Sequence, residues 1–312
     1  MVFRHVGACG ELRQVRKYHS AMTIRTTIVE TPDGRQLCVE SAGDPSGPPV
    51  LVHDGTPNSR HLSAPAISDA EMRGVHLISY DRPGYGGSTA RPGGIVADCT
   101  VDVRAIAESF GMERLATWGI SGGGPYALAC AALLPELITS AATLASLAPY
   151  GVPDLDYFSG MGQDNVDDMR LLLEDPGAAR LRIAVLREET LALTPEQLIS
   201  AWSSLLSPTD TEAASEKAAD IVRCMQDGLA PGDQGWWDES CAHLAPWGFA
   251  VEDIQVPVQV WHGAADQFVP FQHGQWLAAH IAGAEAHLSE GDGHLTLTRQ
   301  LPEIHEWLIE HD

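Results

Sequence analysis

Short apolar runs typical of buried strands alternate with helix-like runs through most of the chain. The segments Val75–Tyr80 and Glu113–Gly119 are strand-like, and between them apolar side chains recur at helical spacing from Ile95 to Phe110. A helix-like run, Gly122–Leu134, and another strand-like run, "LITSAATLAS", follow. Consecutive strands joined by helices form right-handed crossovers, which place the strands parallel. The sequence therefore predicts an α/β fold with a mainly parallel sheet.

The alternation stops in the middle of the chain and then resumes. Residues 151–247 are helix-like and acidic, whereas "VPVQVWHG", a helix over Phe271–Ile281, a strand near Glu285–Ser289 and a closing helix over Leu295–Glu310 restore the pattern. We therefore expect one core, residues 22–150 and 248–312, with an inserted helical segment, residues 151–247. The first 21 residues show no clear period, so we expect a poorly ordered or extraneous segment there; whether Met22 is the start stays open.

Charge and cysteine content exclude several classes of partner. The 312 residues include 42 acidic and 19 basic side chains, a formal charge of −23, and so acidic a surface repels nucleic acid and anionic lipid. No apolar run is long enough to span a membrane. The six cysteines do not have the spacing of metal ligands, so we expect no metal site. We interpret them as reduced thiols and therefore expect a cytoplasmic location. We expect no cofactor. The oligomeric state is left open.

One serine stands among glycines at the junction of a strand and a helix. Residues 119–123 read "GISGG", a G-x-S-x-G pattern. A serine there sits on a tight, strained turn that lifts its hydroxyl above the sheet, and the flanking glycines avoid clashes with the neighbouring strand and helix. The N–H of Gly122, at the start of the helix, points toward any oxyanion formed at that position. We therefore predict that Ser121 is a catalytic nucleophile.

A nucleophilic serine needs a base, and the base needs an acid that orients it. Asp266 follows the strand "VQVW", and His294 lies in a glycine-flanked loop after the last strand. These positions give the order serine, acid, histidine that the G-x-S-x-G turn requires. Asp292 competes for the acid role. However, it lies only two positions before His294 on the same loop, so its carboxylate is too close in sequence to reach the far nitrogen of the imidazole. We interpret His262 as structural.

Four segments in order, "HDGTP", "DRPGYGGS", "GISGGG" and the pair "HGAAD" with "GDGH", resemble those of the α/β-hydrolase fold superfamily. The resemblance covers Met22 to the C-terminus and implies an eight-stranded sheet with an inserted helical cap that shapes the substrate pocket. It also implies that the loop after the third strand supplies a second oxyanion donor, here the backbone N–H of Thr56 beside that of Gly122. The family's histidine in this loop is replaced by Asp54, and Asp81 and Arg82 are expected to hold the fold.

The resemblance is to serine-nucleophile hydrolases of the esterase and proline iminopeptidase-like branch. A serine at position 121 argues against haloalkane dehalogenases and epoxide hydrolases, which attack with aspartate. The loops "HDGTPN" and "GISGG" differ from the HGGPG and GGSWG of proline iminopeptidases. We therefore expect hydrolysis of a small or medium carboxylic ester, lactone or related acyl bond of a small-molecule substrate. Several alternatives stay open: a proline iminopeptidase-like activity, amide or carbon–carbon bond hydrolysis, perhydrolase or halogenation-type activity, and a non-catalytic receptor or interaction protein of the same fold.

Overall fold

The computed structural model describes residues 24–312. The expectations for residues 1–21 and for a start at Met22 therefore lie outside the described residues. Five of the six cysteines are described; Cys38, Cys99, Cys130 and Cys224 are buried, and Cys241 is half-buried. None of the helices within residues 24–312 combines the length and the apolar character that a membrane crossing requires.

Eight strands form one sheet in the order β1-β2-β4-β3-β5-β6-β7-β8. The strands are β1 (Arg25–Glu30), β2 (Gln36–Gly43), β3 (Pro49–His53), β4 (His76–Tyr80), β5 (Leu115–Ile120), β6 (Ile138–Leu144), β7 (Val258–Gly263) and β8 (Glu285–Ser289). The hairpin partner β2 runs antiparallel to β1 and β4, and all other pairs are parallel. The predicted eight-stranded, mainly parallel sheet is confirmed.

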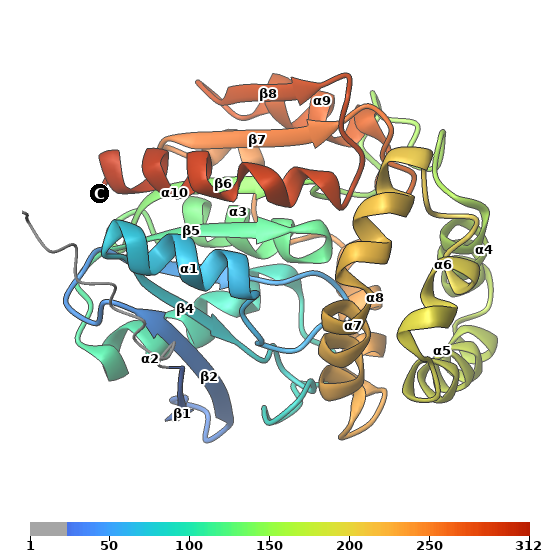
Figure 1. Cartoon of the computed structure of the whole chain (residues 1–312), viewed down its shortest axis with the longest axis horizontal. Helices are drawn as coiled ribbons and strands as arrows, with labels where there is room; N and C mark the ends of the chain where they lie inside the picture. Colours follow the sequence, from blue (N-terminus) through green and yellow to red (C-terminus); the bar gives the residue numbers. More distant parts are fainter. Residues whose placement is uncertain (1–23) are drawn as a thin grey trace, which may run out of the picture.

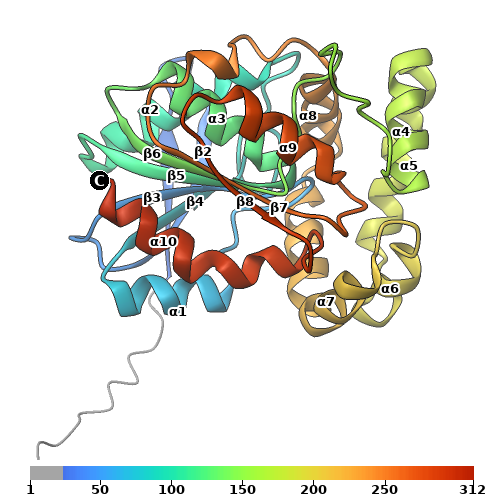
Figure 2. The same ribbon diagram turned by 90° about the horizontal axis from the view of Figure 1, so that it is seen from above.

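Helices cover both faces of the sheet. Helices α1 (Ala64–Arg73) and α10 (Leu301–Glu310) lie on one face, and α2 (Cys99–Phe110), α3 (Gly124–Leu133) and α9 (Phe271–His280) lie on the other, as Figures 1 and 2 show. Each face has its own cluster of buried apolar side chains. Strand β3 serves both, because Leu51 belongs to one cluster and Val50 and Val52 to the other.

The helices between β6 and β7 lie beyond the carboxyl ends of the parallel strands (Figures 1 and 2). They are α4 (Gln163–Glu174), α5 (Pro176–Leu191), α6 (Leu198–Ala201), α7 (Pro208–Leu229) and α8 (Gln234–Leu244), and we call them the cap helices. The described chain has no strand in this stretch. Ligands of open α/β sheets bind outside the carboxyl ends of the strands, so the cap helices overlie the edge where chemistry is expected.

Two details differ from the sequence-based expectation. Helix α1 was not anticipated, although Ser63 caps its start by accepting a hydrogen bond from the N–H of Ala66 and Gly74 ends it at φ 67°. The closing helix is divided: a 3₁₀ turn over Thr296–Gln300 precedes α10, which begins at Leu301 with a proline in its first turn.

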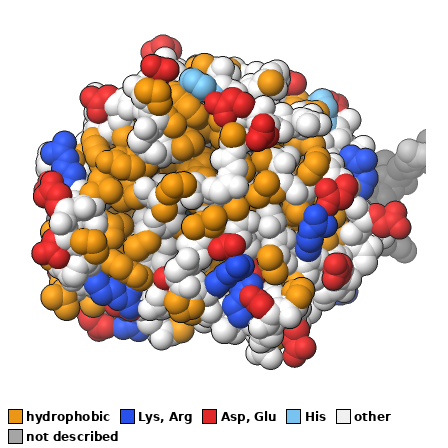
Figure 3. All heavy atoms as spheres, turned by 180° about the vertical axis from the view of Figure 1, so that it is seen from behind, with side chains coloured by type: hydrophobic (Ala, Val, Ile, Leu, Met, Phe, Trp, Pro, Cys, Tyr) orange, Lys and Arg blue, Asp and Glu red, His pale blue; other side chains and the backbone are white. Residues whose placement is uncertain are grey.

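The surface opposite to the view of Figure 1 carries hydrophobic side chains across much of its middle, with acidic and basic side chains around them (Figure 3). Among the cap helices, α5 exposes Leu181 by 72% and Val185 by 50%. Single exposed apolar side chains such as these two are normal on a protein surface.

Candidate active site

Ser121 occupies a strained turn between β5 and α3. Its φ is 54°, a left-handed conformation that is uncommon for residues other than glycine, and a 3₁₀ turn over Ser121–Gly123 connects the strand to the helix. Such strain persists only where the surroundings impose it, and it gathers at functional sites. The predicted strand–turn–helix setting of the G-x-S-x-G segment is therefore present.

The glycines around Ser121 permit close backbone contacts. A Cβ atom at Gly119 would lie 2.4 Å from the carbonyl oxygen of Gly123, and one at Gly123 would lie 2.0 Å from the carbonyl oxygen of His53. His53 is the last residue of β3 and pairs with Gly119 of β5. The turn, the start of α3 and the end of β3 thus pack at distances that leave no room for a side chain.

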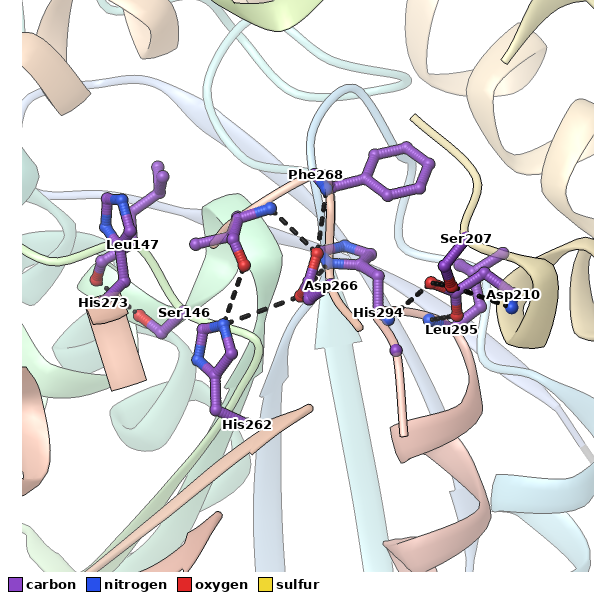
Figure 4. Close-up of polar contacts among 12 residues, drawn as sticks. Ser146, Leu147, Ser207, Asp210, His262, Asp266, Phe268, His273, His294 and Leu295 are labelled. Carbon is purple, nitrogen blue, oxygen red and sulfur yellow. Dashed lines mark hydrogen bonds and ion pairs between the residues drawn. The ribbon is translucent and has the colours of Figure 1, made fainter. Parts of the chain in front are cut away.

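Asp266 and His294 meet beyond the ends of β7 and β8. Asp266 Oδ2 lies 2.7 Å from His294 Nδ1, and Asp266 Oδ1 accepts hydrogen bonds of 2.9 Å from the N–H groups of Phe268 and Val269 (Figure 4). Asp266 is 4% exposed and His294 5%. Two backbone donors therefore hold one buried carboxylate against the imidazole. The contact with the imidazole fixes its proton on Nδ1 and leaves Nε2 as the nitrogen that can accept one.

The competing residues have other partners. Asp292 accepts a hydrogen bond of 2.7 Å from the hydroxyl of Ser289, so the structure pairs His294 with Asp266 and not with Asp292. His262 Nε2 donates to the carbonyl oxygen of Val269 at 2.8 Å and lies 3.6 Å from Asp266 Oδ2. Its buried ring therefore supports the turn that contains Asp266, as expected of a structural residue.

Charge raises the pKa of His294 above its usual value. Burial alone would lower this pKa, but the charge and hydrogen bond of Asp266, and then the charge of Asp210, outweigh burial. The ring of Phe268 stacks on the imidazole with a centroid distance of 4.6 Å. The contacts of His294 thus strengthen it as a proton acceptor while shielding one face from water.

Ser121 is partly exposed and lies beside the loop that follows β3. A Cβ atom at Gly55 would lie 3.4 Å from Ser121 Cβ, and one at Gly122 would lie 2.0 Å from Thr56 Oγ1. The two predicted oxyanion donors, Thr56 and Gly122, are therefore neighbours. Within residues 24–312 no hydrogen bond joins Ser121 to His294, and no acceptor takes the N–H of Thr56. Catalytic hydrogen bonds often tighten only when substrate binds.

Asp54, at the position where the resemblance leads us to expect a histidine, makes a local set of hydrogen bonds. Its Oδ1 accepts from the N–H of Gly55 at 2.6 Å and from Nδ2 of Asn58 at 3.1 Å. Burial raises the pKa of Asp54. The carboxylate thus ties together the loop that presents Thr56, which answers how the chain organises this loop without the histidine.

A buried carboxylate of the cap, Glu239, fastens the same loop and was not anticipated from the sequence. Its Oε2 accepts hydrogen bonds of 2.7 Å from the hydroxyls of Thr56 and Tyr85, and its Oε1 accepts one of 2.6 Å from Arg82. Burial opposes the charged form, but Arg82 outweighs it and lowers the pKa of Glu239. Helix α8 also brings His243, whose Nε2 lies 3.0 Å from the carbonyl oxygen of Gly122.

Arg82 also bonds the loop that contains Thr56, as expected of a residue that holds the fold. Its guanidinium also donates to the carbonyl oxygens of Asp54 and, at 3.1 Å, Gly55. Asp81 accepts from the N–H of Arg60 and of Gly87 at 2.7 Å each. Arg82 therefore holds the loop beside Ser121, and Asp81 joins the segments that contain Arg60 and Gly87. The described residues contain no group of three or more His, Cys, Asp or Glu side chains arranged to hold a metal ion.

Comparison with known proteins agrees with this geometry. A family model described as the alpha/beta hydrolase fold matches residues 48–298. The chain belongs to the α/β-hydrolase fold family. It is accordingly an enzyme, and its relatives carry the names of hydrolases.

Two curated relatives illustrate the range of the family. This α/β-hydrolase is 28% identical to Epoxide hydrolase A of Mycobacterium tuberculosis over 68% of its own chain, a match that spans only 61% of the relative. It is 22% identical to 2-hydroxy-6-oxononadienedioate/2-hydroxy-6-oxononatrienedioate hydrolase of Klebsiella pneumoniae over 87% of its chain and 85% of the relative.

A solved structure shares the fold across nearly the whole chain. An esterase from Rhodococcus sp. ECU1013 superposes with a TM-score of 0.66 and covers 92% of this chain and 99% of its own, at 20% identity. An identity this low establishes the shared fold only.

The close contacts of the α/β-hydrolase turn predict a stability effect. Gly123→Ala adds a methyl group against the backbone of β3, so we expect the free energy of unfolding to fall by about 1–3 kcal/mol, the usual cost of overpacking. Urea and thermal unfolding would measure this. The matched control is Gly291→Ala, whose Cβ would meet no atom within 4 Å. Equal melting temperatures for the two variants would contradict the packing argument.

Proposed function

We propose that this α/β-hydrolase cleaves a small or medium carboxylic ester, lactone or related acyl bond. In this proposal Ser121 is the nucleophile, His294 the general base and Asp266 the residue that orients it. The observation that carries the proposal is the 2.7 Å contact between Asp266 Oδ2 and His294 Nδ1, at the sheet edge where the strained turn presents Ser121. An aspartate bonded to Nδ1 of a histidine is the support that the general base of a serine triad needs.

The reaction begins with proton transfer. His294 Nε2 takes the proton of the Ser121 hydroxyl while Oγ attacks the carbonyl carbon, and the negative charge moves to the carbonyl oxygen. The backbone N–H groups of Gly122 and Thr56 stabilise that oxyanion. The tetrahedral intermediate then expels the alcohol, which receives the proton from Nε2, and leaves an acyl-enzyme. Water activated by the same nitrogen hydrolyses the acyl-enzyme and restores Ser121.

The two curated relatives suggest other reactions. The relative named 2-hydroxy-6-oxononadienedioate hydrolase covers most of the chain, so hydrolysis of an oxo acid of that kind is the second candidate. The relative named an epoxide hydrolase is more similar in sequence, but the turn here carries Ser121 where the resemblance leads us to expect aspartate in an epoxide hydrolase. Ester or lactone hydrolysis needs only the groups that the site contains.

The covalent step predicts a single labelled residue. A fluorophosphonate probe should react once per chain, at a peptide that contains Ser121, because this is the hydroxyl that the proposal supplies with a base and oxyanion donors. Mass spectrometry of the digested protein identifies the peptide. Ser121→Ala should abolish labelling, whereas Ser203→Ala, which removes an exposed hydroxyl of the cap, should leave it unchanged. Labelling that survives Ser121→Ala would refute the assignment.

The two aspartates near His294 should differ strongly. Asp266→Asn should lower kcat for a p-nitrophenyl ester by roughly three to four orders of magnitude, because the imidazole loses the acceptor that fixes its tautomer. Asp292→Asn removes a carboxylate bonded to Ser289 and should lower kcat by about tenfold at most, a loss outside the triad. Steady-state kinetics on both folded variants gives the ranking, and the reverse order would place the acid on the histidine loop.

The oxyanion donor at position 56 should be the backbone. Thr56→Val and Thr56→Pro both remove the hydroxyl bonded to Glu239, but only proline removes the N–H. Thr56→Pro should therefore lower kcat by about two to three orders of magnitude relative to Thr56→Val. Circular dichroism checks that both variants fold. If folded Thr56→Val is as inactive as Thr56→Pro, the hydroxyl itself takes part in catalysis.

A further inference from the structure

Asp210 is a buried carboxylate on a cap helix, and the mechanism above does not use it. It is the third residue of α7, and its exposed fraction is 0%. Burial of a carboxylate is unfavourable unless several donors replace its water. The hydrogen-bond donors around Asp210 therefore identify the segment that it holds.

Most of these donors belong to the loop that carries His294. Asp210 Oδ2 accepts from the N–H of His294 at 2.8 Å, and Oδ1 accepts from the N–H of Leu295 at 2.7 Å and of Thr296 at 3.4 Å. The hydroxyl of Ser207 donates to Oδ2 at 3.0 Å. Figure 4 shows Asp210 on one side of His294 and Asp266 on the other. One carboxylate thus holds the backbone of His294, and another holds its ring.

Two further contacts show that the loop is shaped to receive this carboxylate. A Cβ atom at Gly293 would lie 2.1 Å from Asp210 Oδ2, so the residue before His294 has to be small. Lys217, two turns further along α7, donates from Nζ to the carbonyl oxygen of Leu295 at 3.2 Å. The cap helix therefore bonds both an N–H and a carbonyl group of Leu295.

Helix capping does not account for these contacts. Ser207 caps α7 with its own hydroxyl, which accepts from the N–H of Asp210 at 3.2 Å. An aspartate in the first turn also favours a helix through its charge, but that effect needs no bond to another segment. The three amides of residues 294–296 are bonded in addition to the cap.

We propose that Asp210 is a positioning residue that sets the place of His294 from the cap. This rests on the proposed function, in which His294 is the base that activates Ser121. By fixing the loop backbone, Asp210 sets the distance from Nε2 to the serine, and a misplacement of about 1 Å can cost a hundredfold in rate. The cap thereby contributes to the chemical step itself and not only to the shape of the pocket.

The charge of Asp210 should also affect the pH dependence of the reaction. The charged or titratable groups that face His294 are Asp266 and His262 on the β7 side, and Asp210 and Lys217 from α7. Burial lowers the pKa of His294. The negative charge of Asp266 raises it most, and that of Asp210 raises it further. Loss of the Asp210 charge should therefore lower that pKa. Because His294 works in its neutral form, the acid limb of activity should move to lower pH.

The test measures the rate of fluorophosphonate labelling at Ser121 from about pH 5 to about pH 9, the range in which a histidine titrates. Asp210→Asn keeps the shape of the side chain but turns an amide toward backbone N–H groups. We expect labelling at the plateau to fall roughly tenfold to a hundredfold and the acid limb to shift to lower pH. Asp220→Asn, on the same helix with its side chain 64% exposed, should match the wild type.

A second variant covers the case in which Asp210→Asn does not fold. Gly293→Ala keeps the carboxylate but forces it away from the loop, so it should lower the labelling rate and shift the acid limb in the same direction. Thermal melting confirms folding of each variant. A folded Asp210→Asn or Gly293→Ala variant with the wild-type rate, or with a lower rate and an unmoved acid limb, overturns the positioning role. Absence of labelling at Ser121 in the wild type would instead refute the proposed function.

Discussion

The strained turn at Ser121 depends on the close packing of three backbone segments. The φ of 54° at Ser121 is held because the end of β3, the end of β5 and the start of α3 approach too closely for any side chain at Gly119 or Gly123. The same packing places the loop after β3 against Gly122, which brings Thr56 beside it. One set of backbone contacts therefore determines both the direction of the candidate nucleophile and the position of the candidate oxyanion donors. The rest of the site is arranged around this point.

The cap reaches both halves of the candidate site through buried carboxylates. Glu239 on α8 holds the loop of Thr56 together with Arg82, and Asp210 on α7 holds the loop of His294. Each carboxylate accepts at least three hydrogen bonds, which is the condition under which a buried charge is tolerated. Loss of Glu239 would leave the buried guanidinium of Arg82 without its carboxylate partner, a costly change for a buried ion pair. The cap helices are thus integral to the architecture of the site.

The sequence predicted the sheet, most element positions and the meeting of Asp266 with His294, because these follow from periodicity and from the order of strands. It did not predict Asp210 or Glu239. Ser207 and Asp210 form an S-x-x-D pattern that indicates a local helix cap, and the bonds of Asp210 to residues 294–296 depend on tertiary packing. Glu239 lies in "GWWDES" beside Asp238, and only burial distinguishes the two acids. Helix α1 and the 3₁₀ turn before α10 were missed for a related reason, since capping and tertiary contacts decide them more than apolar spacing.

Not all of the acidic side chains behind the formal charge of −23 lie on the surface. An acidic surface keeps a protein soluble and repels anions, but Asp210, Glu239 and Asp266 are each at most 4% exposed and contribute little to that surface. Hydrogen bonds from backbone N–H groups stabilise the carboxylates of Asp210 and Asp266, and the ion pair with Arg82 together with two hydroxyl donors stabilises that of Glu239. Of the three, only Asp266 touches the ring of His294, whereas the other two act on backbone loops. In the candidate site, Asp266 orients the ring of the base, whereas Asp210 and Glu239 of the cap helices hold the loops that carry His294 and Thr56.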